Sequence, residues 1–176
     1  MKKSLLSVFA LSMFLMASTT MTAQKFSGLD KSPLDIAYMK ADRNSPPVVK
    51  VIYSRPQLKG RSLSSLAPNG EVWRTGANEA TEIIFYQDTK VGGEMVKAGT
   101  YSLFTVPGEK QWKVILNSDR DGWGSYGYKE SNNVAEFMVD VKSDSKELEA
   151  FSIAFDSNGM HMGWGTLRVM VPIEMR

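Results

Sequence analysis

The densest group of side chains able to do chemistry lies in residues 73–80. Arg74, Asn78 and Glu79 stand within six residues there, directly after a tryptophan. A guanidinium presents a rigid fork of donors that suits carboxylate, phosphate or sulfate groups, and a nearby amide can fix the orientation of such a ligand. The indole of Trp73 can wall the site. The segment therefore predicts a ligand-binding site.

Two further arginines, Arg55 and Arg61, lie in the turn-rich segment that precedes it. If the strand around Tyr53 pairs with the strand around Ile83, as neighbours in sequence often do, these arginines and Arg74 converge at one end of the sheet. Unused donors there would hold a small anionic or saccharide ligand, or a peptide end. A non-enzymatic binding module is therefore our first hypothesis.

The same residues also allow a structural interpretation. Glu79 would pair with Arg74 or Arg61 in a partly buried bridge that pins the turn at 75–78. Breaking such a pair costs about 3–5 kcal/mol, because it leaves one charge without its partner. Residue types and spacing do not separate an architectural bridge from a ligand site, so both interpretations stay open.

A second candidate is the loop at 121–128, in which glycines separate three aromatic residues. Exposed faces of Trp123 and Tyr126 suit sugar rings or other flat ligands. In the alternative, Trp123 closes the open end of the fold and the tyrosines cover its rim. The glycines fit a loose G-x-G-x-x-G pattern, but no strand–helix–strand unit surrounds it to make a phosphate-binding loop.

Paired carboxylates are the catalytic arrangement that the sequence leaves open. Glycosidases use two acids about 5–10 Å apart. Glu79 and Glu82 fall on opposite faces if their strand is regular. Three other acids can complete a pair with Glu79 in space: Glu71, Asp88 and Asp121. A hydrolase that uses Glu79 as acid or base, with an arginine stabilising an anionic intermediate, is our second hypothesis.

The sequence offers few residues for thiol, serine-hydrolase or metal chemistry. The chain has no cysteine, which excludes disulfides, thiol catalysis and cysteine-based metal sites. His161 is the only histidine, its methionine neighbours favour a rim or core position, and no G-x-S-x-G string surrounds a serine. We therefore name no catalytic residue, no metal ligand and no cofactor, and favour a non-enzyme while leaving that question open. A structural envelope module acting through strand edges is the third hypothesis.

Alternation with period two runs through most of the chain and predicts strands. Val49, Val51 and Tyr53 share one face, and apolar residues on both faces at 83–86 predict a central strand. Further strands are predicted around 101–106, 112–116, 135–141, 151–155 and 167–173. Turn sequences separate them at Asn69-Gly70, Gly92-Gly93, Ala98-Gly99, Pro107-Gly108 and Asn158-Gly159. Residues 62–66 predict one helical turn.

About eight to ten short strands predict an all-β fold, either an antiparallel β-sandwich or a partly closed, jelly-roll-like barrel. Antiparallel neighbours are expected because the connections are too short for crossovers. We divide the chain into a signal peptide at 1–23, an extended lead-in at 24–47 able to add one edge strand, and a single β-sandwich domain at 48–176.

Residues 1–23 have the features of a cleavable secretory signal. Lys2 and Lys3 form a cationic start, an apolar run follows at 5–17, and Thr22-Ala23 offers small residues before a cleavage point at Gln24. The apolar run is shorter than the ~20 residues that span a bilayer, and a retained N-terminal anchor is the alternative. We expect an exported protein, periplasmic or extracellular, with no membrane span after cleavage.

Removal of this peptide also balances the charge. The chain has 21 basic and 19 acidic residues, and the loss of Lys2 and Lys3 leaves 19 of each. Nucleic-acid binding needs a basic surplus that displaces counterions from phosphates, so we expect no nucleic-acid partner. The sequence defines no protein partner. About 150 mature residues suffice for one hydrophobic core.

Several strings from Tyr53 onward carry a family resemblance. They are Tyr53-Ser54-Arg55-Pro56, Lys59-Gly60-Arg61, the string at 69–80, Lys90-Val91-Gly92-Gly93, the string at 98–104, Trp123-Gly124 and Trp164. In them the chain resembles domain of unknown function 2911, exported bacterial proteins with no established activity. The resemblance covers nearly all of the mature chain and implies a β-rich exported domain. It implies no catalytic residue, because the family has no assigned reaction.

Overall fold

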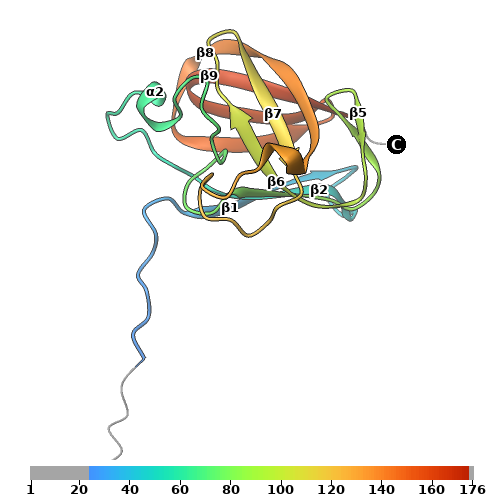
Figure 1. Ribbon diagram of the computed structural model, residues 1–176, viewed down its shortest axis with the longest axis horizontal. Coiled ribbons are helices and arrows are strands. Elements are labelled where there is room, and N and C mark those ends of the chain that lie inside the picture. The colour runs from blue at the N-terminus through green and yellow to red at the C-terminus, as the bar shows by residue number, and fades with distance from the viewer. Residues whose placement is uncertain (1–23, 175–176) are drawn as a thin grey trace, which may run out of the picture.

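The computed structural model describes residues 24–174, and the predicted signal peptide lies outside the described residues. Within that range nine strands pair into one sheet (Figure 1). The strands are β1 (Leu34–Lys40), β2 (Pro47–Ser54), β3 (Thr81–Phe85), β4 (Thr89–Val91), β5 (Glu94–Val96), β6 (Gly99–Val106), β7 (Gln111–Asn117), β8 (Asn133–Asp156) and β9 (Gly159–Glu174). Every neighbouring pair is antiparallel. The predicted all-β, antiparallel, single-domain fold is confirmed.

The strand order is β1-β2-β3-β6-β7-β8-β9-β4-β5. β1 and β5 form the two edges, so the sheet is not a closed barrel. The hairpin of β4 and β5 lies between β3 and β6 in sequence. In the sheet it pairs instead with β9, at the opposite edge from β1. Residues of β4 and β5 thereby join the same hydrophobic core as residues that are distant from them in sequence.

The sheet bends until the second half of β8 faces the end of β2. The Ile153 N–H donates to the Tyr53 hydroxyl at 2.8 Å. Just beyond β2, the Phe151 N–H donates to the Pro56 carbonyl at 2.9 Å. In the view of Figure 1, β8 and β9 lie above β1 and β2. The two halves of one sheet therefore enclose the core.

β8 joins what the sequence predicted as two strands. The intervening residues 142–147 are polar and do not alternate, yet they remain part of the strand. Its pairing with β9 shifts register between Ser143 and Leu148 and again between Leu148 and Ser152. Such irregularities let a strand bend, and β8 thus pairs with β7 in its first half and faces β2 in its second.

Four aromatic side chains from distant segments meet in the core. Trp73 is 5% exposed, Trp112 and Trp164 1% each, and Phe151 0%. The Trp73 ring stacks on Trp164 with centroids 5.5 Å apart and meets Trp112 edge to face at 6.0 Å. Large aromatic surfaces dominate core energetics when they are buried in this way. Trp73 is therefore a central packing residue.

Smaller predictions agree with the structure in part. The helical turn is α2 (Leu63–Leu66), whose preceding Ser62 hydroxyl accepts the Ser65 N–H at 3.2 Å. The sheet begins with edge strand β1, inside the segment expected as lead-in. The 3-10 helix η1 (Glu130–Asn132) was not predicted. Over residues 24–174, none of the helices has the length and hydropathy needed to cross a membrane.

Candidate functional site

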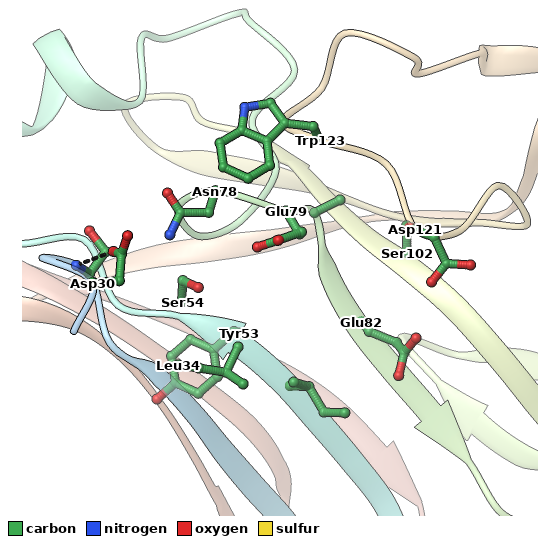
Figure 2. Close-up of a pocket in the computed structure, with 13 residues that line it drawn as sticks. Asp30, Leu34, Tyr53, Ser54, Asn78, Glu79, Glu82, Ser102, Asp121 and Trp123 are labelled. Atoms are coloured by element: carbon green, nitrogen blue, oxygen red, sulfur yellow. Dashed lines mark hydrogen bonds between the residues drawn. The ribbon is translucent and has the colours of Figure 1, made fainter. Parts of the chain in front are cut away.

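A cleft of about 640 Å³ opens on the outer face of the sheet, at the ends of β2, β3 and β6. Its walls are the loop before β3, the loop after β7 and the segment that leads into β1 (Figure 2). In that view Trp123 lies above Asn78 and Glu79, with Asp30 to one side and Asp121 and Glu82 to the other. We call this the Trp123 cleft.

Two backbone hydrogen bonds fasten the loops that form the cleft. The Ala80 N–H donates to the Gly122 carbonyl at 2.8 Å, and the Gly124 N–H donates to the Asn78 carbonyl at 2.9 Å. Together they form a short antiparallel bridge that sets Glu79 opposite Trp123. Because both loops are tied to each other, the position of the exposed indole is fixed by backbone pairing.

The same loops contain an unusual backbone. Three of the four non-glycine residues with positive φ lie there: Thr75 at 54°, Asn78 at 61° and Asp121 at 60°. A left-handed conformation is especially unfavourable for a β-branched residue such as Thr75. The Thr81 hydroxyl donates to the Thr75 carbonyl at 2.8 Å and helps to hold this geometry. Strained backbone of this kind is concentrated at functional sites.

Close packing below the loop adds a further constraint. A Cβ on Gly76 would lie 2.9 Å from the Thr81 hydroxyl oxygen and 3.0 Å from the Ser54 carbonyl oxygen. Those oxygens belong to β3 and β2, so residue 76 sits directly on the sheet. The glycine in this string is explained by this close approach, and the loop has little freedom to move away from the cleft.

Four carboxylates line the Trp123 cleft: Asp30, Glu79, Glu82 and Asp121. No lysine or arginine from residues 24–174 lines it. Within residues 24–174, none of the four carboxylates forms an ion pair. Carboxylates are ionised at neutral pH in water, so the cleft concentrates negative charge.

Asp30 is the one acid of the cleft with hydrogen-bond donors around it. The Ser32 N–H donates to its Oδ1 at 2.6 Å. This bond, followed by a bond from the Asn78 side chain, holds the pKa of Asp30 below its usual value, and neighbouring Lys31 acts in the same direction. Asp30 therefore stays ionised and is unsuited to be a general acid.

Three of the residues predicted for the site line the Trp123 cleft, namely Asn78, Glu79 and Trp123. Trp123 is 61% exposed, so it does not close the end of the fold. Tyr126 is 89% exposed on the same loop but does not line the cleft. Trp73 is buried in the aromatic core and is not available as a wall for a ligand.

The predicted arginines are not brought together at the cleft. Arg55 spans the junction of β2 and β8: its Nε donates to the Phe151 carbonyl at 3.1 Å and its Nη2 to the Ser152 hydroxyl at 2.6 Å. Its Nη1 lies 3.0 Å from an Asp35 carboxylate oxygen. Each of the three guanidinium nitrogens of Arg55 thus makes a bond, and together these bonds join the two halves of the sheet.

Arg61 is engaged by its own turn. Its Nε donates to the Leu58 carbonyl at 3.0 Å and its Nη2 to the Gln57 carbonyl at 2.8 Å. It lines a separate depression with residues of β9. Arg61 fastens a local turn, and its donors are directed at carbonyls instead of at the Trp123 cleft.

Arg74 lies beneath the loop of Trp123. A Cβ on Gly124 would be 3.8 Å from its Nη1. Its Nε is buried and has no hydrogen-bond partner among the described residues. The expected ion pair of Glu79 with Arg74 or Arg61 is not formed within residues 24–174. The bridge that the structural interpretation required is therefore missing.

Residues that sequence reasoning did not place here complete the cleft. Glu82 lines it together with Glu79, although regular alternation put them on opposite faces. Glu79 precedes β3, and the left-handed Asn78 breaks the alternation before the strand begins. Ser102 pairs with Glu82 across β3 and β6 and so shares its face. No sequence pattern indicated that Asp30 belongs to the site, because it is 48 positions before Asn78, the residue with which it forms a hydrogen bond.

Metal chemistry finds no obvious place in this part of the chain. Among the described residues, no group of three or more His, Cys, Asp or Glu side chains is arranged to hold a metal ion. His161 lies away from the cleft, on β9, with its Nε2 2.9 Å from an Asp156 carboxylate oxygen. Both side chains are about half exposed at the hairpin of β8 and β9.

Comparisons with known proteins agree with the family resemblance. No curated protein and no solved structure shows a significant match to the chain. One family model, described as protein of unknown function (DUF2911), matches residues 35–173. That span contains seven of the nine strands in full and all but one residue of β1 and of β9. The chain therefore belongs to the DUF2911 family of proteins of unknown function.

Proposed function

We propose that this protein is a binding module that takes a saccharide into the Trp123 cleft. The observation that carries the proposal is the position of Trp123, 61% exposed, at the edge of a cleft of about 640 Å³ lined by carboxylates, an amide and hydroxyls. That volume lies within the ~300–1,000 Å³ of typical ligand pockets. Exposed indole faces suit the apolar faces of sugar rings.

The polar groups of the cleft complement hydroxyl-rich ligands. Ionised carboxylates accept hydrogen bonds only, whereas an amide both donates and accepts. Glu79, Glu82 and Asp121 make neither a side-chain hydrogen bond nor an ion pair within residues 24–174, so their acceptors are free for a ligand. Asn78 adds donors beside them. A sugar hydroxyl can donate to the acids and accept from the amide.

An anionic ligand, the other class that the sequence predicted, is disfavoured by the charge of the cleft. Its four carboxylates would repel an anion, and the arginines expected to receive one lie elsewhere. Like-charge contacts of this kind cost free energy and reject wrong partners. Of the anionic and saccharide ligands expected from the sequence, we therefore retain the saccharide.

Rigidity of the loops also favours binding. The bridge between residues 78–80 and 122–124 fixes the indole and the carboxylates before a ligand arrives. Preorganised groups lose less conformational entropy on association. The strain at Thr75, Asn78 and Asp121 is explained if it serves this arrangement.

Tryptophan fluorescence provides a direct test. Trp73, Trp112 and Trp164 are at most 5% exposed, so acrylamide quenching reports mainly on Trp123. We expect an oligosaccharide from a panel of neutral and charged glycans to protect Trp123 from quenching. Trp123→Ala should weaken binding by roughly tenfold or more, about 1.4 kcal/mol, measured by calorimetry.

Tyr86→Ala is the matched control, because Tyr86 is 52% exposed but does not line the cleft. It should bind as the wild type does, and both variants should keep the wild-type melting temperature. If no glycan of the panel protects Trp123, or if binding survives Trp123→Ala, the proposal is wrong.

A hydrolase remains the second candidate, because Glu79, Glu82 and Asp121 line one concave cleft. Two carboxyl groups on one site are what glycoside hydrolysis requires. A glycan that protects Trp123 should then be cleaved, and Glu79→Gln should slow cleavage by about 10²–10⁴-fold. Chromatography of the bound glycan after prolonged incubation separates the two candidates. An intact glycan contradicts the hydrolase and supports the binding module.

A further inference from the structure

We infer that the saccharide held in the Trp123 cleft carries protonated amino groups, which makes it an amino sugar with free amines. This rests on the proposed function and adds the charge of the ligand to it. The inference comes from three features that lie together: the unpaired carboxylates, a serine hydroxyl that makes no hydrogen bond within residues 24–174, and the exposed indole.

The carboxylates provide the electrostatic reason. Asp30, Glu79, Glu82 and Asp121 surround one cleft without an ion pair among the described residues. A neutral sugar that displaced water from the cleft would leave four negative charges facing one another with less screening. An ammonium group relieves that repulsion and adds attraction to each acid.

Ser102 provides an independent reason. Its residue is only 4% exposed, and it lines the cleft from β6 between Glu82 on β3 and Asn117 on β7. Its hydroxyl makes no hydrogen bond with another residue of 24–174. A serine hydroxyl can both donate and accept, and this one lines the cleft with that capacity unused by the described residues. A ligand group in the cleft can therefore hydrogen-bond with it.

An ammonium group satisfies these partners together. It has three donors and no acceptor, and the groups near Ser102 are acceptors: the Ser102 oxygen itself and the carboxylates of Glu82 and Asp121. Figure 2 shows Ser102, Glu82 and Asp121 on the same side of the cleft. A hydroxyl group of a neutral sugar would donate only once.

Trp123 fits the same ligand. Aromatic faces attract cations through the ring quadrupole, most strongly for tryptophan. A sugar ring that stacks on the exposed indole can thus present apolar C–H groups to it and direct its ammonium groups toward the acids below. The combination of an aromatic face with acidic groups distinguishes amino sugars from neutral and anionic ones.

Four probes test the inference on the chain from Gln24 onward. They are glucosamine oligomers, N-acetylglucosamine oligomers and glucose oligomers of equal length, together with spermidine. We expect the glucosamine oligomer to bind roughly tenfold more tightly than either neutral oligomer near neutral pH and at low salt. This preference should shrink as salt shortens the screening length from ~30 Å at 0.01 M to ~3 Å at 1 M.

Charge-removing variants locate the effect. Glu82→Gln and Asp121→Asn should each reduce the preference for the glucosamine oligomer over the glucose oligomer several-fold. Glu109→Gln is the matched control, since Glu109 is exposed and does not line the cleft. It should retain the full preference, and all three variants should melt at the wild-type temperature.

Each result separates this inference from the proposed function. Equal affinity for all three oligomers overturns the inference and leaves the saccharide site standing. Spermidine binding as tightly as the glucosamine oligomer supports recognition of charge but contradicts a saccharide site. If none of the four probes protects Trp123 from quenching, the inference fails, and the proposed function then depends on the wider glycan panel.

Discussion

Arg55 illustrates how a residue suited to ligand binding is used for architecture. Its guanidinium joins the end of β2 to β8 through the Phe151 carbonyl, the Ser152 hydroxyl and the Asp35 carboxylate. The fork geometry that makes arginine a good anion receptor makes it equally able to link three acceptors of one protein. Without this link, the two halves of the bent sheet lose a polar clamp near their junction.

We predict that Arg55→Ala lowers the free energy of unfolding by about 2 kcal/mol, because it removes charge-assisted bonds from a side chain that is only partly exposed. Chemical denaturation measures the change. Saccharide affinity should be unaffected, since Arg55 does not line the Trp123 cleft. Arg43→Ala, at an exposed turn residue, is the control and should change stability by less than about 0.5 kcal/mol. A loss of affinity with unchanged stability would contradict the architectural role.

Trp73 and Trp123 show the same division between similar residues. Both lie next to residues of the predicted site, but one is 5% and the other 61% exposed. Trp73 occurs where the chain crosses the interior, and its backbone pairs with Thr105 on β6. Trp123 occurs in a loop of glycines held away from the sheet by residues 78–80. Residue type alone did not separate these two tryptophans, and the path of the backbone decides which is buried in the core and which is exposed at the cleft.

The strands were largely predictable because their alternation follows from the sheet itself. Val49, Val51 and Tyr53 are all buried on one face of β2, as their spacing predicts. Trp112, Val114 and Leu116 do the same on β7. Period-two burial is a local property that needs no knowledge of the neighbouring strand. This explains why the fold class could be predicted before any pairing was known.

The length of β8 was not predictable on the same grounds. Its middle residues 142–147 are polar and mostly exposed, so they give no alternation to detect. They are held in strand conformation by pairing with β9, at Lys142 with Arg168 and at Ser143 with Leu167. Tertiary pairing overrides local preference here, as it often does in sheets.

The cleft was predicted only where its residues are local. The loop at 73–80 and the loop at 121–128 were both identified, but nothing in either string indicated that they pair through Ala80 and Gly122. Such a contact depends on which strands adjoin, and the arrangement of β3 beside β6 and β6 beside β7 sets it. The acidic character of the cleft follows from the same juxtaposition, and of the anionic and saccharide ligands expected from the sequence it disfavours the anionic one.

The whole molecule combines a bent sheet with a site at its outer face that uses only a small part of the fold. The aromatic core lies between the two halves of the sheet, whereas the Trp123 cleft is formed by loops, by the residues before β1 and by the outer face of β2, β3 and β6. The proposed binding can therefore change through the peripheral segments while the core remains intact. The segment before β1 is the clearest case, because it contributes Asp30 but no strand.

We predict that a chain beginning at Ser32 folds normally and binds the glucosamine oligomer roughly two- to fivefold more weakly, because it loses the Asp30 carboxylate. Lys25 and Lys31 are removed with Asp30 but do not line the cleft. The Arg55 N–H still finds the Pro33 carbonyl, at 3.0 Å, because Pro33 remains. Asp30→Asn in the uncut chain should match the truncation in calorimetry, while both keep the wild-type melting temperature. If the truncated chain melts well below Asp30→Asn, the segment supports the fold, and the separation of site from core is wrong.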